Sequence, residues 1–194
     1  MTDKERLIEG GVLAMPAKID ERFVYPPVDF VEPDAVFGND LLVLRGATLW
    51  LFGVLASSIH RAWIRMLAKR EDGFLVYDIG RIYNNLPWPE KTPQAEERVA
   101  AAARELISTR DAFNADTLLT LYLDSSIPMA VRLAHKALDE AVLAAYDLPP
   151  DADDAAIQTE LMRRYAALVN QHGINNKATM GGGGVNYKIY HIAA

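Results

Sequence analysis

The segment at residues 81–90, RIYNNLPWPE, constrains the fold more than any other stretch of the sequence. Pro87 and Pro89 have no amide hydrogen and restrict the residues before them, so neither a helix interior nor a central strand can pass through. The chain must therefore continue here in an extended form. Trp88 can anchor that form by burying its ring against a neighbouring element. The segment predicts a stiff connection between two halves with different patterns.

The half before this connection predicts short strands. Residues 12–30 are typical of a hairpin that turns around Ile19 to Glu21, with Pro26 and Pro27 confining the second strand to an edge or ending it. Residues 41–44 follow a Gly-Asn-Asp turn and predict a buried strand.

A long helix is expected next. Thr48 is placed to cap a helix that continues to about Arg70. Beyond that helix, Asp72 and Gly73 predict a tight turn followed by two further strands, at 74–77 and 81–83.

The half after the connection predicts helices. Apolar residues recur at helical spacing beyond Pro93, and Gly173 stands where a C-terminal cap is expected. The later helices are expected at 116–122, 128–146 and 151–172. The predicted fold class is α+β, a small mixed α/β portion followed by an α-helical bundle. The expected boundaries are 1–90, 91–175 and a flexible tail at 176–194.

The composition limits the compartment and the class of site. The chain has no cysteine, which excludes disulfides and thiolate metal sites and favours a cytoplasmic location. Its most apolar region, residues 41–59, is interrupted by Arg45 and Gly46, so no membrane partner is expected. The histidines form no zinc-type pair, and Ser57 with His60 on one helix is poor geometry for nucleophilic catalysis. We therefore expect no catalytic residue, no metal site and no cofactor in this chain.

Charge is distributed unevenly along the sequence. The net charge of −6 argues mildly against nucleic acid, yet residues 41–70 contain five basic residues and no Asp or Glu. Arg61, Arg65 and Lys69 recur every four residues, as one stripe of the expected helix. Such a stripe can contact phosphates, or it can be an ordinary solvated helix face.

Several motifs resemble one known family, the MmeI-like (type IIL) restriction-modification enzymes. ATLWLFGVLASSIHRAWIR at 47–65 and IYNNLPWP at 82–89 match the family patterns ATLYHFGVLTSxxHMAWMR and VYNNFPWP in residue type and spacing. LAMPAKIDERFVYPPVDF at 13–30 and LYLDSSIPMAVRLAHKALDEAV at 121–142 also resemble family segments. The resemblance covers roughly residues 13–146, and it is most specific at the Asn-Asn-x-Pro-Trp-Pro element.

The resemblance implies a piece of a larger enzyme. Family members join a nuclease, a helical spacer, an adenine-amino DNA methyltransferase, a target-recognition domain and C-terminal helices. The methyltransferase uses S-adenosylmethionine and an Asn-Pro-Pro-Tyr motif, which this sequence lacks, as it lacks the cofactor-binding glycine loop. The expected function is therefore DNA recognition and scaffolding without catalysis. The expected partners are double-stranded DNA and the methyltransferase domain of the parent enzyme.

Candidate DNA-contacting residues come from the basic stripe and from the resemblance together. They are Arg65, Lys69, Arg70, Asp72, Tyr77, Asn84, Asn85, His60 and Arg61. Phosphate contacts are expected from the basic residues at 65–70, and base contacts from the loop at 71–77 and the asparagine pair. Two positions depart from the family pattern, since Phe74 replaces a charged reader of a base pair and Val76 replaces an arginine.

Other readings of these residues stay open at this point. His60 can be a packing residue that hydrogen-bonds the neighbouring sheet, and the asparagine pair can cap a turn. His135 and Asp139 fit hydrogen bonding between helices of the bundle. The alternative function, from another class, is a structural module that docks on a partner and has no DNA affinity of its own.

Overall fold

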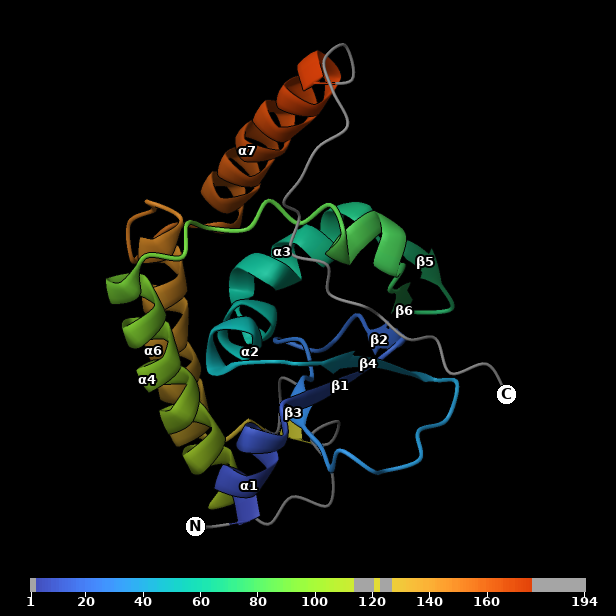
Figure 1. Ribbon diagram of the computed structural model, residues 1–194, viewed down its shortest axis with the longest axis vertical. Coiled ribbons are helices and arrows are strands. Elements are labelled where there is room, and N and C mark those ends of the chain that lie inside the picture. The colour runs from blue at the N-terminus through green and yellow to red at the C-terminus, as the bar shows by residue number, and fades with distance from the viewer. Residues whose placement is uncertain (1–2, 114–120, 123–126, 176–194) are drawn as a thin grey trace.

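The computed structural model describes residues 3–113, 121–122 and 127–175. Helix α1 (Asp3–Gly10) leads into two small sheets, helices α2 and α3 cover them, and three longer helices follow (Figure 1). This arrangement confirms the α+β class, with helices dominating the second half. None of the helices in the described ranges is long and apolar enough to cross a membrane.

The first sheet contains strands β3 (Asp29–Phe30), β1 (Val12–Pro16) and β4 (Leu41–Arg45), in that order and antiparallel. Leu13 of β1 pairs with Phe30 on one side and with Leu44 on the other. Strand β4 was expected to be buried, but only Leu44 is, because β4 is an edge strand with one unpaired side.

The second sheet contains β2 (Lys18–Asp20), β6 (Phe74–Val76) and β5 (Lys69–Glu71), again antiparallel. The expected hairpin around Ile19 to Glu21 is wrong, because Ile19 pairs with Leu75 of β6 and not with the segment that follows it. Ala17 alone separates β1 from β2, and its backbone joins the sheets by bonding Asp40 and Tyr77. The chain thus passes from one sheet directly into the other.

The expected long helix is two helices, α2 (Leu49–Ala56) and α3 (Ser58–Leu67), with Ser57 between them. Thr48 caps α2 as predicted, accepting a hydrogen bond from the Leu51 amide at 3.3 Å. Ser57 has extended backbone angles, and its hydroxyl both donates to the Val54 carbonyl and accepts from the His60 amide. One serine therefore ends the first helix and begins the second.

The segment before the proline connection is also helical where a strand was expected. Residues Ile79–Tyr83 form a π-helix, η1, and Asp78 caps it by accepting from the Arg81 amide at 2.8 Å. Trp63 of α3 donates its indole N–H to the Ile82 carbonyl at 2.9 Å, which ties this turn to the core. The predicted role of Trp88 is confirmed, since its ring packs edge-on to Tyr83 at 5.5 Å.

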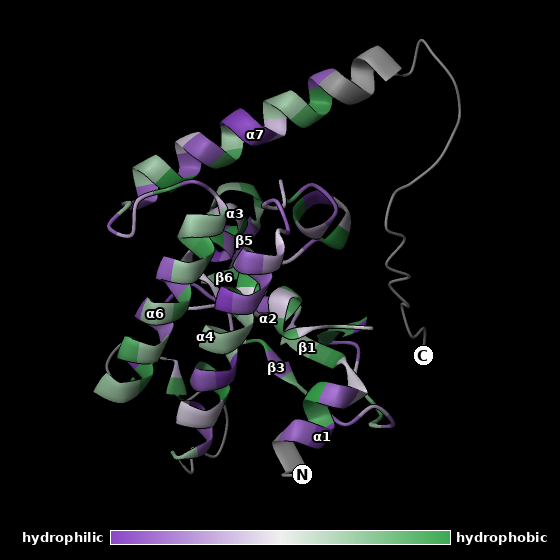
Figure 2. Ribbon diagram, turned by 60° about the vertical axis from the view of Figure 1, so that its left-hand side comes forward, coloured by the Kyte–Doolittle hydropathy of each residue, from purple (hydrophilic) through white to green (hydrophobic). Residues whose placement is uncertain are grey.

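The second half contains α4 (Pro93–Asp111), α6 (Met129–Ala145) and α7 (Asp154–Asn175). The helix expected at 116–122 lies almost entirely outside the described residues. Gly173 does not end the last helix but lies within it. Helices α4 and α6 run side by side against α2, whereas α7 crosses over α3 and extends beyond the body (Figures 1 and 2).

The two halves share one hydrophobic core. A Cβ placed on Gly53 of α2 would clash with Val99 Cγ1 of α4 and lie 3.3 Å from Leu138 Cδ1 of α6. Glycine is therefore what allows α2 to approach the helical half so closely. The buried apolar residues of both halves form a single cluster.

A buried arginine joins the halves at a second place. Arg110, near the end of α4, is only 4% exposed and donates to the Val28 carbonyl at 3.1 Å and to Tyr122 Oη at 2.8 Å. It also pairs with Asp29 of β3 at 3.4 Å, and its guanidinium lies over the Phe52 ring. The helical half therefore holds the edge of the first sheet.

The close packing at Gly53 gives a direct test of the shared core. Gly53→Val inserts three carbons where the backbone approaches Val99, and we expect it to lower the free energy of unfolding by about 1–3 kcal/mol. Urea denaturation followed by circular dichroism measures the change. Gly38→Ala is the matched control, because a Cβ there meets no described atom within 4 Å. Equal stability of the two variants would contradict the packing described.

Candidate nucleic-acid interface

Strands β5 and β6 form an exposed hairpin that carries several charged side chains. Glu71 pairs with Phe74, so the loop has two residues, Asp72 and Gly73, with φ of 49° and 83°. Both values lie in the left-handed region, which Gly adopts freely and Asp tolerates. The predicted turn is confirmed, and the Asp72 and Phe74 side chains are exposed at its tip.

Three cations surround the base of this hairpin, but they do not share one helical stripe. Helix α3 ends at Leu67, so Lys69 and Arg70 lie on β5 while Arg65 lies on the last turn of the helix. The predicted stripe through Arg61, Arg65 and Lys69 is therefore wrong as a helix feature. Both strand cations are exposed, and Arg70 donates to the carbonyl of the half-buried Arg65 at 3.2 Å.

These cations are held by neighbouring oxygens. Lys69 pairs with Glu71 at 2.7 Å, and Glu71 also lies 3.6 Å from Lys18 of β2. Arg70 Nε lies 3.3 Å from the Glu21 carboxylate, and Arg65 donates to the Glu21 carbonyl at 3.3 Å.

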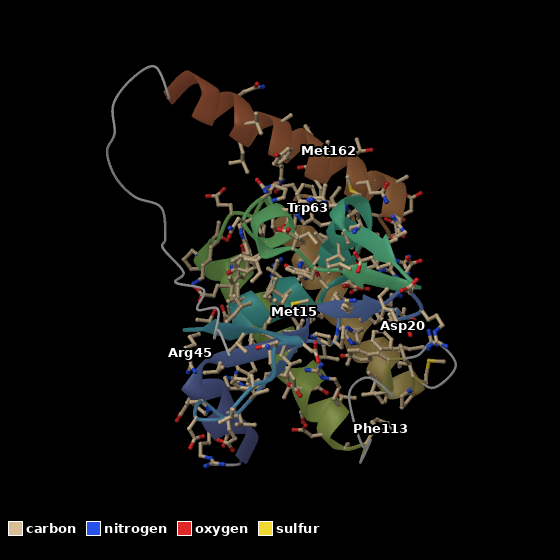
Figure 3. The ribbon with its side chains drawn as sticks, turned by 90° about the vertical axis from the view of Figure 1, so that its right-hand side faces the viewer. Met15, Asp20, Arg45, Trp63, Phe113 and Met162 are labelled. Atoms are coloured by element: carbon tan, nitrogen blue, oxygen red, sulfur yellow. The ribbon has the colours of Figure 1, made fainter. Side chains whose placement is uncertain are left out.

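An open hollow of about 240 Å³ lies at this point, lined by Glu21, Arg65, Arg70 and Leu75. Two of the described residues that line it are arginines, which suits an anionic group such as a carboxylate or a phosphate. Figure 3 labels Asp20, the last residue of β2, and the next residue, Glu21, lines the hollow.

Arg61 is not among the described residues that line this hollow. It donates to the Val24 carbonyl at 3.0 Å and pairs with Asp154 of α7 at 3.2 Å. The side chain is 21% exposed. In this chain Arg61 therefore links α3 to the start of α7.

His60 and Tyr77 lie in the core and bond each other. His60 Nδ1 is 2.7 Å from the Leu55 carbonyl and must donate to it, so Nε2 accepts from Tyr77 Oη at 2.9 Å. Burial lowers the pKa of His60 to about 4 and raises the pKa of Tyr77. Both groups are neutral near pH 7, and they lock α3 against the end of β6. The packing role considered for His60 is therefore confirmed.

The two asparagines differ in their surroundings. Asn85 donates its side-chain amide to the Gly80 carbonyl at 2.7 Å and to the Arg81 carbonyl at 3.1 Å, and so caps η1. Asn84 bonds Ile79 through its backbone and leaves its side chain exposed. The turn-capping interpretation is confirmed for Asn85, while Asn84 presents its amide to solvent.

Asp139 and His135 of α6 reach different partners. Asp139 accepts from the Ser58 amide at 2.7 Å and so caps α3, which corrects the expectation of a bond within the bundle. Burial of its carboxyl raises the pKa of Asp139 to about 6. His135 bonds Tyr122 Oη at 2.8 Å and stacks on Tyr25 at 3.7 Å. Within the described ranges, no group of three or more acidic or histidine side chains is placed to hold a metal ion.

The sequence matches two domain families of one protein. Residues 3–90 match the family described as the MmeI target recognition domain, and residues 90–172 match the MmeI C-terminal domain. The chain therefore belongs to the MmeI-like restriction-modification proteins and represents their C-terminal part.

Two individual relatives agree with this assignment. The chain is 29% identical over 159 residues to DNA methyltransferase A of Bacillus subtilis (strain 168), covering 82% of this chain and 18% of that protein. The solved structure of the type IIL restriction-modification enzyme MmeI in complex with DNA has the same fold, with a TM-score of 0.78 at 24% identity. That match covers 82% of this chain and 21% of the enzyme. The chain thus spans about a fifth of each relative.

The buried pair of His60 and Tyr77 gives one prediction. Tyr77→Phe leaves His60 Nε2 buried without its donor, and we expect the free energy of unfolding to fall by about 1–3 kcal/mol. Tyr165→Phe on α7 is the control, since its ring contact with Trp63 is retained, and we expect a change within about 0.5 kcal/mol. Chemical denaturation at pH 7 measures both. A Tyr77→Phe variant as stable as the control would show that the hydrogen bond does not hold α3.

Asp139 gives a prediction about pH. Its pKa is raised to about 6 from 3.8, so between these values the folded chain holds a proton that the unfolded chain has released. Its contribution to stability is therefore fully present below about pH 4 and is lost as pH rises through 6.

The variant Asp139→Asn isolates this effect, because the amide cannot titrate but can still accept from Ser58. We expect its stability relative to the native chain to increase by roughly 1–3 kcal/mol between pH 4 and pH 7. Urea denaturation of both proteins across this range measures the difference between their free energies of unfolding. His60 titrates in both proteins, so its contribution cancels in that difference. A difference that is flat with pH would contradict the raised pKa.

Proposed function

We propose that this chain is the DNA-recognition and scaffolding part of an adenine-specific DNA methyltransferase of a restriction-modification system, and that it has no catalytic activity alone. The observation that carries the proposal is the exposed β5–β6 hairpin, with Lys69 and Arg70 on one strand and Asp72 at the tip. The hairpin lies within residues 3–90, which match the MmeI target recognition domain. A two-stranded ribbon of this kind fits the major groove of DNA.

The exposed residues divide into two roles in this proposal. Lys69, Arg70 and Arg65 contact phosphates, which requires only positively charged side chains. Asp72 and Asn84 carry exposed groups that can read base edges, since a carboxylate accepts from cytosine and an amide pairs with adenine.

The remaining candidate residues hold neighbouring elements in place in this proposal. His60 and Tyr77 hold the hairpin on α3, Asn85 fixes η1, and Arg61 fixes α7. Their contribution to DNA binding is to position the exposed residues rather than to touch the duplex.

Catalysis belongs to another portion of the parent protein in this proposal. The sequence has no Asn-Pro-Pro-Tyr motif and no glycine loop for S-adenosylmethionine, so these residues do not fit that cofactor. The methyltransferase portion would hold it and would be the protein partner of this chain. Exposed apolar side chains on the outer helices, Met129, Leu133, Met162 and Val169, support such docking (Figure 3, Met162).

Binding to duplex DNA at several salt concentrations tests the proposal. We expect affinity to fall steeply with salt, and Lys69→Gln and Arg70→Gln each to weaken binding severalfold and to reduce the log–log salt slope by up to about 1. Lys136→Gln on α6 is the matched control, because this exposed lysine lies away from the hairpin, and we expect it to bind as the native chain does. Fluorescence anisotropy with a labelled duplex measures all four proteins.

Salt-independent binding, or none, would overturn DNA recognition by this chain. Co-purification with a separately expressed methyltransferase portion, without DNA affinity, would then identify the chain as the docking module alone.

A further inference from the structure

Glu21 contacts the hairpin tip through its amide, Arg65 through its carbonyl and Arg70 through its carboxylate. It follows β2 directly, and its amide donates to the Gly73 carbonyl at the hairpin tip at 3.1 Å. Its carbonyl accepts from Arg65 at 3.3 Å, while its carboxylate lies 3.3 Å from Arg70 Nε. The backbone of Glu21 therefore fixes it to the hairpin, and its side chain is free to leave Arg70 without moving that backbone.

The contact between Glu21 and Arg70 is exposed, with 40% and 58% of the two side chains open to solvent. Exposed ion pairs of this kind are weak, so another anion can replace the carboxylate easily. A carboxylate and a phosphate offer a guanidinium the same kind of oxygen acceptors. The open hollow beside the pair, lined also by Arg65 and Leu75, gives such an anion access.

The other cations of this sheet are paired in the same way. Lys69 and Lys18 share Glu71, and Arg22, two residues after β2, pairs with Asp20 at 2.6 Å. Every cation on the three strands of this sheet thus has a carboxylate partner before DNA arrives. Glu21 is distinct among these acids because its carboxylate borders the hollow that also contains Arg65.

We propose that Glu21 competes with the DNA backbone for Arg70 and so limits the affinity of the hairpin for DNA of any sequence. The inference rests on the proposed function, since it concerns the same surface. Phosphate contacts carry no sequence information, so weakening one of them lowers non-specific and specific binding alike. Glu21 is a positioning residue in this sense, because it sets the strength of a phosphate contact through Arg70 and touches no base itself.

The variant Glu21→Gln tests the competition while keeping the size of the side chain and both backbone bonds. We expect it to bind two unrelated duplexes of equal length about two- to fivefold tighter than the native chain at low salt. Glu32→Gln is the matched control, because Glu32 forms an exposed pair with Arg6 near α1, away from the hairpin, and we expect no change. Thermal unfolding confirms that each variant is folded.

The double variant Glu21→Gln/Arg70→Gln separates competition from general repulsion between an acid and DNA. If Glu21 acts by occupying Arg70, the gain disappears when Arg70 is absent. A gain of the same size in the Arg70→Gln background overturns the inference, as does equal affinity of Glu21→Gln and the native chain. Either result leaves DNA recognition standing. Failure of the native chain to bind DNA overturns both proposals, so the two failures are distinguishable.

Discussion

The hydrogen bond from the Ser58 amide to Asp139 is the constraint on which the arrangement of the first half depends. Ser57 breaks the helical run, and the free amides of the new helix need an acceptor. Asp139 supplies it from α6, 81 residues further along the chain. The direction of α3, and of everything attached to its end, is thus set by the helical half. The β5–β6 hairpin follows α3 after one residue and inherits that direction.

Neutral, buried groups hold the hairpin on the side that faces the core, and its charged side chains lie on the side that faces solvent. His60 and Tyr77 join α3 to β6 without any charge near pH 7, and Trp63 ties the same helix to η1. A rigid support of this kind lets short exposed side chains keep a fixed geometry. The strand cations on the solvent side, Lys18, Lys69 and Arg70, each lie close to a carboxylate, which offsets their charge.

Local signals in the sequence predicted local features well. The Asp72-Gly73 turn, the Thr48 cap and the three long helices beyond Pro93 (α4, α6 and α7) each depend on a few neighbouring residues, and the structure has them. The break at Ser57 could not be predicted in this way, because the bond that holds it comes from a distant helix. The pairing of β2 with β6 is also long-range, and the alternation at 12–30 fits a local hairpin equally well. The strand expected at 81–83 is part of a π-helix instead, because Asp78 caps the turn and Trp63 of α3 bonds the Ile82 carbonyl.

The shared core changes what counts as a separable module in this protein. The matched families meet at residue 90, yet Gly53 and Val99 touch across that point, and Arg110 reaches back to Val28. A chimera joined at residue 90 would combine α2 from one parent with α4 from another. Any larger residue opposite the glycine would force the helices apart, and loss of the arginine would leave the first sheet unsupported. The exposed tip of the β5–β6 hairpin can therefore be exchanged more easily than the whole recognition half.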